Sequence, residues 1–254
     1  ASDAYSDNNS GSTTFYVNDG GVVGVVNPFT NTSDALISYN EGGTGSLWVR
    51  GTRLGGTMTT SGNTVYTTNL TGNYPDATKS YLVSQCYNLS NVINPQISFA
   101  MKFDLEQNWD VVYVQYSTNF GASWTVLGTM GAGWYNSNRT QATTGSDCYN
   151  CPGAQWTGTN TTLTTYTYPL NALNSETNVI FRIVFHSDES ANQLGVNIDD
   201  FVINEQIILE AKAVTSLNSE HLSQTMNYLK ISGKQLGLIV NFGSKSLQVK
   251  RVVL

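Results

Sequence analysis

The sequence predicts a mainly β protein, in which a two-sheet sandwich is followed by a short C-terminal segment of different composition. Charged residues make up 12% of the chain, about half the usual share, and Thr, Ser, Asn, Gly and Tyr replace them, as is common in secreted β proteins. Apolar and polar residues alternate over several short segments, which is the period of a strand with one buried face. Turn signals separate these segments without helical periodicity between them, which favours a sandwich.

The first 44 residues are expected to form an extended N-terminal segment with short strands. Residues 1–20 are polar and have little to bury. Residues 22–26 and 35–39 are apolar enough to form short strands on either side of the turn at Asn27-Pro28.

The sandwich is expected over residues 45–205. Its clearest strand is predicted where five apolar residues alternate with smaller or polar ones over nine positions: Ile97, Phe99, Met101, Phe103 and Leu105. Further strands are expected at residues 81–83, 111–116, 124–127, 179–185 and 196–203. The last of these is strongly apolar, so we expect it to be an interior strand that closes the sandwich.

The net charge changes sign near residue 206. Residues 1–205 contain six Lys/Arg and sixteen Asp/Glu, a net charge of −10, whereas residues 206–254 contain six and two, a net charge of +4. This change indicates a boundary between the sandwich and a C-terminal segment of residues 206–254. An acidic body argues against binding to a phosphate backbone, so nucleic acid is not an expected partner. No apolar run reaches the length of a membrane span, so membrane insertion is not expected.

The three cysteines predict one small disulfide. Cys148 and Cys151 form a C-x-x-C motif in a polar loop. A zinc site needs four ligands, and the two histidines of the chain lack a finger-like spacing, while a redox motif would need a strand-to-helix context. We therefore expect a structural Cys148–Cys151 bridge formed in an oxidising compartment, with Cys86 left as a buried thiol.

Several segments of the sandwich carry a resemblance: Trp48-Val-Arg-Gly51, Ser80-Tyr-Leu-Val-Ser84, Tyr113-Val-Gln-Tyr-Ser117, Phe181-Arg-Ile-Val-Phe-His-Ser-Asp188 and Gly195-Val-Asn-Ile-Asp-Asp-Phe-Val202. Residues 45–203 resemble the MAM-like, carbohydrate-binding-module-like jelly rolls of secreted bacterial proteins. The resemblance implies a jelly-roll sandwich, an extracellular or cell-surface location, and a non-catalytic role in recognition or adhesion, with a glycan or cell-surface partner. It also implies a structural Ca²⁺ at Asp199 and Asp200; the alternative is that these carboxylates end a solvated strand.

The segment Ser117-Thr-Asn-Phe-Gly-Ala-Ser-Trp124 is similar to the Asp-box motif Ser-x-Asp-x-Gly-x-x-Trp, with Asn119 in place of the usual Asp. The physical role of this motif is structural. Its Asn or Asp caps the turn, its Gly adopts an unusual backbone angle, and its Trp fills the base of the hairpin. We expect a hairpin here, and not glycosidase activity.

A glycan site, if the sandwich has one, is expected in the long polar stretch of residues 128–162, because a polar loop of this length in a compact domain is usually functional or disordered. The stretch carries four aromatic residues that are candidates to stack on sugar rings: Trp134, Tyr135, Tyr149 and Trp156. The alternative is that these rings anchor the core or the loop, as aromatic residues more often do.

The C-terminal segment carries a second resemblance, through Ile207-Ile-Leu-Glu-Ala-Lys-Ala-Val214, Gln224-Thr-Met-Asn-Tyr-Leu-Lys230, Gly237-Leu-Ile-Val-Asn-Phe-Gly243 and Lys250-Arg-Val-Val253. These parts resemble the C-terminal half of GxxExxY proteins, which are small members of the PD-(D/E)XK nuclease superfamily. The resemblance covers residues 200–254 and implies a small α/β unit of the order β-α-β-β. For an active nuclease it implies a Mg²⁺ site and five site residues: Asp200, Glu210, Lys212, Gln224 and Tyr228.

The spacing of these residues indicates their chemistry. Glu210 and Lys212 are two apart on a strand, so both side chains point to one face. A carboxylate from the preceding strand would complete the Mg²⁺ site, and Lys212 would orient the attacking water. A two-residue turn between the two strands would place Asp199 opposite Glu210, and a three-residue turn would place Asp200 there.

No Gly-x-x-Glu-x-x-Tyr motif precedes Asp199, so we expect no catalysis, and a surface ion pair is the alternative interpretation of Glu210 and Lys212.

Three functions remain open. The first is an extracellular recognition module that carries a truncated nuclease-like tail. The second is a Mg²⁺-dependent nuclease or a decayed relative of one, and the third is a structural subunit of a self-assembling surface structure.

Overall fold

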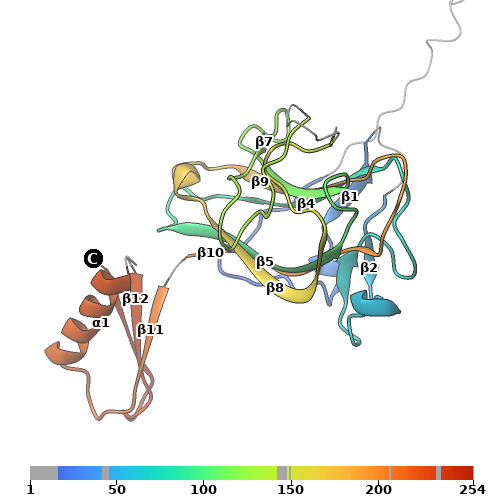
Figure 1. The fold of residues 1–254 in the computed structure, drawn as a ribbon. Coiled ribbons are helices and arrows are strands. Elements are labelled where there is room, and N and C mark those ends of the chain that lie inside the picture. The colour runs from blue at the N-terminus through green and yellow to red at the C-terminus, as the bar shows by residue number, and fades with distance from the viewer. Residues whose placement is uncertain are drawn as a thin grey trace, which may run out of the picture.

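Two five-stranded antiparallel sheets form the body of the protein (Figure 1). The first has the strand order β1 (Ile37–Asn40), β4 (Lys79–Tyr87), β9 (Val179–His186), β6 (Val111–Ser117) and β7 (Thr125–Val126). The second has the order β2 (Val49–Gly51), β3 (Val65–Thr67), β10 (Gly195–Glu205), β5 (Pro95–Asp104) and β8 (Thr159–Pro169). Short 3₁₀ helices lie in the connections: η2 (Thr32–Asp34), η3 (Gly56–Met58) and η4 (Asn171–Leu173). This computed structural model describes residues 17–41, 46–141, 148, 150–205, 207–232 and 236–253.

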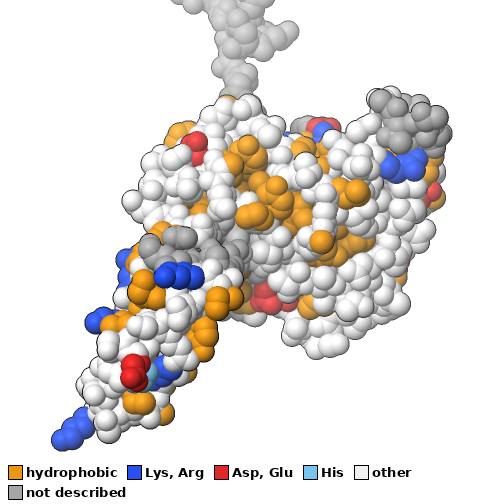
Figure 2. All heavy atoms as spheres, turned by 60° about the vertical axis from the view of Figure 1, so that its left-hand side comes forward, with side chains coloured by type: hydrophobic (Ala, Val, Ile, Leu, Met, Phe, Trp, Pro, Cys, Tyr) orange, Lys and Arg blue, Asp and Glu red, His pale blue; other side chains and the backbone are white. Residues whose placement is uncertain are grey.

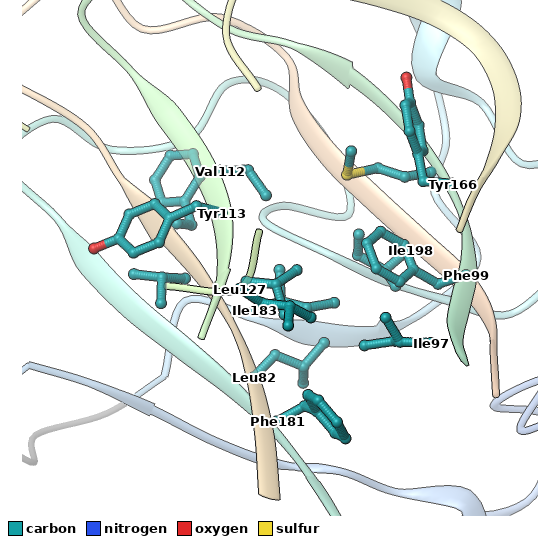
Figure 3. Packing of buried hydrophobic residues seen from close by; sticks show 14 of the residues in the cluster. Leu82, Ile97, Phe99, Val112, Tyr113, Leu127, Tyr166, Phe181, Ile183 and Ile198 are labelled. Carbon is teal, nitrogen blue, oxygen red and sulfur yellow. The ribbon is translucent and has the colours of Figure 1, made fainter. Parts of the chain in front are cut away.

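The hydrophobic core lies between the two sheets, because alternate residues of each strand point inward. Figure 3 shows Leu82 and Ile183 of the first sheet close to Ile97 and Phe99 of the second, and all four side chains are buried. The predicted mainly β sandwich is therefore confirmed.

Residues 17–41 belong to the sandwich rather than to a separate segment before it. Tyr39 of β1 pairs with Tyr81 of β4 in the first sheet. Asn27 forms an isolated bridge with Phe201 of β10 in the second sheet. The segment expected to end at residue 44 therefore contributes to both sheets.

The interior strand predicted at residues 196–203 is β10, which lies between β3 and β5. It pairs with β5 as far as Glu205, which is opposite Pro95, with a bulge between Asp199 and Val202. The prediction that β10 forms a hairpin with the next strand is wrong, because β11 pairs with β12 in a different sheet. The physical reason is that β5 offers β10 a partner of matching length and apolar pattern, so β10 stays paired to its end.

A third sheet and one helix form the C-terminal module, defined here as residues 207–253. Its elements are β11 (Ile207–Lys212), α1 (Ser219–Ser232), β12 (Leu236–Asn241) and β13 (Gln248–Val253). β11 and β12 are parallel, which requires a crossover connection, and α1 supplies it. The side chain of Asn218 accepts hydrogen bonds from the backbone N–H groups of Glu220 and His221, and thereby caps the start of α1. The predicted β-α-β-β order is confirmed.

Helix α1 covers one face of this small sheet. Leu229 of the helix, Ile239 of β12 and Val252 of β13 are buried between them. On the opposite face Leu209 and Val249 are exposed. In Figure 2, Lys and Arg side chains gather on this module, in agreement with the change of charge in the sequence.

The predicted disulfide is confirmed. Cys148 and Cys151 are bridged, with their Cα atoms 5.4 Å apart, and Cys86 is a free, half-buried cysteine. Within the described residues, the helices are too short or too polar to cross a membrane.

Candidate functional site

Three of the four aromatic residues proposed as a sugar-stacking surface lie in the core instead. Trp134, Tyr135 and Trp156 are 4%, 1% and 0% exposed, so none of these rings has a free face for a ligand. The indole of Trp156 lies 4.9 Å from the ring of Trp134 and 4.5 Å from that of Tyr135, measured between ring centroids. The stacking role expected for these three residues is therefore wrong, and Tyr149 lies outside the described residues.

Their polar atoms explain why the rings are held inside. The indole N–H of Trp134 donates to the carbonyl of Leu127, and that of Trp156 donates to the carbonyl of Trp134. The hydroxyl of Tyr135 donates to the carbonyl of Val114. Because each ring has both an apolar environment and a partner for its polar atom, burial carries no hydrogen-bonding penalty.

A pocket with a volume of about 730 Å³ lies at one end of the first sheet. We call it the acidic pocket, and its walls include Glu106, Trp109, Asn150, His186, Asp188 and Glu189. β6 and β9 are antiparallel neighbours, with Val111 opposite His186. The residues just before β6 and just after β9 therefore meet at the same end of the sheet.

Trp109 is half-buried in the wall of this pocket. Its backbone N–H donates to the carbonyl of Glu106 in a tight turn after β5. The disulfide packs against the same turn, because the Sγ of Cys151 lies 3.7 Å from the carbonyl oxygen of Asn108 and the Sγ of Cys148 lies 3.9 Å from that of Trp109. The bridge thus supports the position of the tryptophan, a role that the sequence did not indicate.

Three carboxyl groups converge beside Trp109. One oxygen from each of Glu106, Asp110 and Asp188 lies within 4.8 Å of the others. The carboxylate of Asp110 is fully buried and accepts hydrogen bonds from the hydroxyl of Tyr74 and from the backbone N–H of Asp188, the latter at 2.8 Å. One oxygen of Glu106, Oε2, is buried without a hydrogen-bond partner.

This arrangement raises the pKa values of its acids. Desolvation by burial raises the pKa of Asp110 to about 6, against its ordinary 3.8. Burial, followed by repulsion from Asp188 and Asp76, raises the pKa of Glu106. Three close carboxylates repel one another unless a proton or a cation lies between them. Oxygen ligands at this spacing, including an unpartnered one, fit a hard divalent cation.

Among the described residues that line the acidic pocket, His186 supplies the one basic side chain. Burial, with a smaller contribution from Lys79, lowers the pKa of His186 to about 4. The ring is therefore neutral near pH 7, and offers one hydrogen-bond donor and one acceptor.

Asp199 and Asp200 lie elsewhere, in β10 of the second sheet. Asp199 is buried and accepts a hydrogen bond from the backbone N–H of Asp200 at 2.9 Å, and Asp200 is exposed with a φ of 51° at the bulge. Burial raises the pKa of Asp199 to about 6. Neither residue belongs to the group of three acids found in the described part of the chain. The structure thus gathers carboxylates around Asp110, and not at the predicted pair.

The C-terminal module brings together four of the five residues implied by the nuclease resemblance. The Nζ of Lys212 lies 2.7 Å from the Oε1 of Glu210 and donates to the Oε1 of Gln224 at 2.7 Å. The amide of Gln224 donates in turn to the hydroxyl of Tyr228 at 2.6 Å. Asp200 does not join them, because it lies in the sheet of the sandwich. The carboxylate expected from the preceding strand is therefore not supplied by β10.

Two comparisons with known proteins found similarities. The sequence model of one family, the PD-(D/E)XK nuclease superfamily, matches residues 166–252, which agrees with the resemblance of the C-terminal segment. No curated protein matches the chain.

Solved structures similar to the chain include carbohydrate-binding modules. One, in complex with β-1,4-galactotriose, is 8% identical with a TM-score of 0.38, and the match covers 67% of this chain and 88% of that one. A module specific for non-crystalline cellulose is 11% identical with a TM-score of 0.38, covering 76% and 99%. The K3 cleaved adhesin domain of Lys-gingipain from Porphyromonas gingivalis W83 is 13% identical with a TM-score of 0.42, covering 73% and 100%.

Proposed function

We propose that the sandwich is a non-catalytic recognition module that binds a glycan in the acidic pocket, with Trp109 as the ring on which a sugar stacks. One observation carries this proposal: a half-buried tryptophan forms the wall of a pocket of about 730 Å³ that is also lined by carboxylates, an amide and an imidazole. A concave site with an aromatic surface and a few convergent polar groups is the usual form of a small-molecule site.

The polar residues of the pocket suit sugar hydroxyls. Asp188 and Glu189 supply acceptors, Asn150 supplies both donors and acceptors, and neutral His186 supplies one of each. A hydroxyl group both donates and accepts, so such a mixed set satisfies it. An extracellular or cell-surface location is part of the proposal, and the disulfide beside the pocket supports it, because such bridges persist in oxidising compartments.

A Ca²⁺ ion is the second part of the proposal, at the three acids rather than at Asp199 and Asp200. Glu106, Asp110 and Asp188 would hold it, and the unpartnered Oε2 of Glu106 supports this placement. When bound, the ion would offset two of the three carboxylate charges and rigidify the turn that carries Trp109.

Glycan binding tests the proposal directly. The purified chain, in buffer containing Ca²⁺, is screened against an array of neutral and acidic glycans, and the best ligand is titrated by calorimetry. Trp109→Ala is expected to weaken binding at least tenfold, about 1.4 kcal/mol. Phe120→Ala is the matched control, because this ring is 80% exposed in the turn between β6 and β7, and does not line the acidic pocket. Equal binding by the wild type and Trp109→Ala, or an equal loss in both variants, would contradict the proposal.

A nuclease activity of the C-terminal module is the second candidate. The family match and the hydrogen-bonded line from Glu210 to Tyr228 support it. A Mg²⁺ site in this module would need a further carboxylate, and the described part of the module offers only Glu210 and the exposed Glu220 of α1. Plasmid cleavage with Mg²⁺ or Mn²⁺ by the purified chain tests this second candidate.

A further inference from the structure

Arg182 lies on the outer face of the first sheet, in the middle of β9. Its chain neighbours Phe181 and Ile183 point into the core, so the side chain of Arg182 points away from it. In the register of the sheet, Arg182 is flanked by Val83 of β4 and Gln115 of β6.

Two aromatic rings hold the guanidinium of Arg182 between them. Its central carbon lies 4.1 Å from the ring centroid of Tyr81 and 4.1 Å from that of Trp124. The Nε of Arg182 donates to the Oε1 of Gln115 at 2.7 Å. Tyr81 on β4 and Trp124 next to β7 approach Arg182 from opposite sides of β9, and Nε is fixed, so the edge that carries the terminal nitrogens is left for other contacts.

The donors on that edge are not used up by the protein. A guanidinium has five N–H donors, and Arg182 contacts Gln115 and the hydroxyl of Tyr39. Within the described residues no carboxylate lies within ion-pair distance of Arg182. None of its nitrogens is both buried and unpartnered, so a terminal nitrogen that contacts neither Gln115 nor Tyr39 has access to solvent.

Other cations of the sandwich are used differently. Arg53 is fully buried and donates to the carbonyls of Asn69 and Gly72. Arg50 donates to the carbonyls of Phe29 and Asn31. These side chains donate to backbone carbonyls of loops, whereas Arg182 is held by two aromatic rings and the side chain of Gln115.

The occupant of this edge follows from its shape and charge. A rigid guanidinium edge matches a carboxylate, because two parallel N–H donors meet two oxygens in one plane. Trp124 is half-buried beside it, so its ring has surface left on which a sugar can pack. We infer that Arg182 and Trp124 form a subsite for a carboxylate-bearing saccharide, such as a uronic acid.

This inference rests on the proposed function for the ligand class, but uses different residues. His186, which lines the acidic pocket, lies four residues further along β9, about 13 Å from Arg182 at the rise of a strand. An oligosaccharide that extends from the pocket along the outer face would reach the subsite. The net charge of −10 over residues 1–205 repels anions from the sandwich in general. A fixed cation on its surface would therefore favour those acidic sugars whose carboxylate can contact it directly.

The test uses nuclear magnetic resonance of the tryptophan indole N–H groups, with glucuronate, glucose and acetate as separate probes. Glucuronate is expected to shift the Trp124 signal, whereas glucose at equal concentration is not, and acetate binds at least tenfold more weakly. No response of Trp124 to glucuronate, or an equal response to glucose, would contradict the inference. An equal affinity for acetate would overturn the saccharide class, because the site would then be a simple anion site.

Variants assign the effect to Arg182. Arg182→Gln is expected to weaken glucuronate binding at least tenfold, and Arg182→Lys, which keeps the charge but loses the paired donors, by about threefold or more. Lys79→Gln is the matched control, because Lys79 lies on the same face but is paired with Glu41 at 2.8 Å, and it should change affinity less than twofold. An equal loss of glucuronate affinity in Lys79→Gln and Arg182→Gln would show that the effect depends only on net charge, and would refute the subsite.

Trp109→Ala separates the two proposals. If the acidic pocket binds no glycan but the subsite exists, the Trp124 signal still responds to glucuronate in this variant. If the pocket binds glycans but the subsite does not exist, Trp109 responds in the wild type while Trp124 and the Arg182 variants show no effect.

Discussion

Trp156→Ala is expected to destabilise the sandwich severely, because this residue is core and not ligand surface. Its side chain is fully buried, and its ring centroid lies 4.5 to 5.9 Å from the rings of Tyr135, Trp134, Tyr166 and Phe99. Truncation of a buried tryptophan costs about 3–5 kcal/mol. Each of the four aromatic pairs adds about 0.5–1.5 kcal/mol beyond the buried area, so we expect a loss at the upper end, about 5 kcal/mol.

Denaturation by urea, followed by circular dichroism, measures this loss. A cost of about 5 kcal/mol is a large part of the 5–15 kcal/mol that stabilises a typical domain, so the variant should be largely unfolded in mild urea. Trp156→Phe, which keeps an aromatic ring, is the control and should cost less than half as much. A loss below about 1 kcal/mol together with a loss of glycan binding would refute this reasoning, and would restore Trp156 as a binding residue.

Three further predictions concern pH, calcium and catalysis. The folded-state pKa of Asp199 is raised to about 6 from 3.8, so the folded state binds the extra proton, and the free energy of unfolding falls as pH rises between these values. Asp199→Asn should remove about 1–3 kcal/mol of this fall, as urea titrations at pH 4 and pH 7 would show. An unchanged dependence of stability on pH in this variant would exclude Asp199 as its source. Ca²⁺ at about 100 times its dissociation constant should stabilise the wild type by about 2.7 kcal/mol. It should raise the melting temperature more at pH 7.5 than at pH 5, where Asp110 is protonated. Asp188→Asn should abolish the rise in melting temperature, and a rise that persists in this variant would place the ion elsewhere. The purified chain should not nick plasmid DNA with Mg²⁺ or Mn²⁺, and nicking that disappears in Glu210→Ala and Lys212→Ala would make the C-terminal module the active part.

The fold was largely predictable because its signals are local. The alternation from Ile97 to Leu105 became β5, and the apolar segment at residues 196–203 became the interior strand β10. The disulfide was predictable because Cys148 and Cys151 are three residues apart in one loop. In the C-terminal module, spacing placed Glu210 and Lys212 on one face of a strand, and the resemblance to GxxExxY proteins implied that Gln224 and Tyr228 join them.

The partner of β10 was not predictable from local signals. Both the hairpin with β11 and the pairing with β5 fit the pattern of residues 196–205, and only the second leaves Asp199 and Asp200 away from Glu210. Pairing partners far apart in sequence depend on the packing of the whole sandwich, which periodicity does not encode.

The candidate site was missed for a similar reason. Trp134, Tyr135 and Trp156 have the residue types of a sugar-binding surface, but a sequence does not reveal on which side of a loop a ring lies. The acidic pocket is built from two turns 78 residues apart, at Asp110 and Asp188. One signal was present: if the strands at residues 111–117 and 179–186 are taken as antiparallel neighbours, their adjoining turns must meet.

The most direct test of the central claim is the indole N–H spectrum of the five tryptophans during titration with the best neutral glycan from the array. We predict that the signal of Trp109, assigned by its absence in Trp109→Phe, shifts in proportion to bound glycan. The signals of the buried Trp134 and Trp156 should remain in place. A titration in which Trp109 does not move, while glycan binds, would contradict the acidic pocket as the binding site.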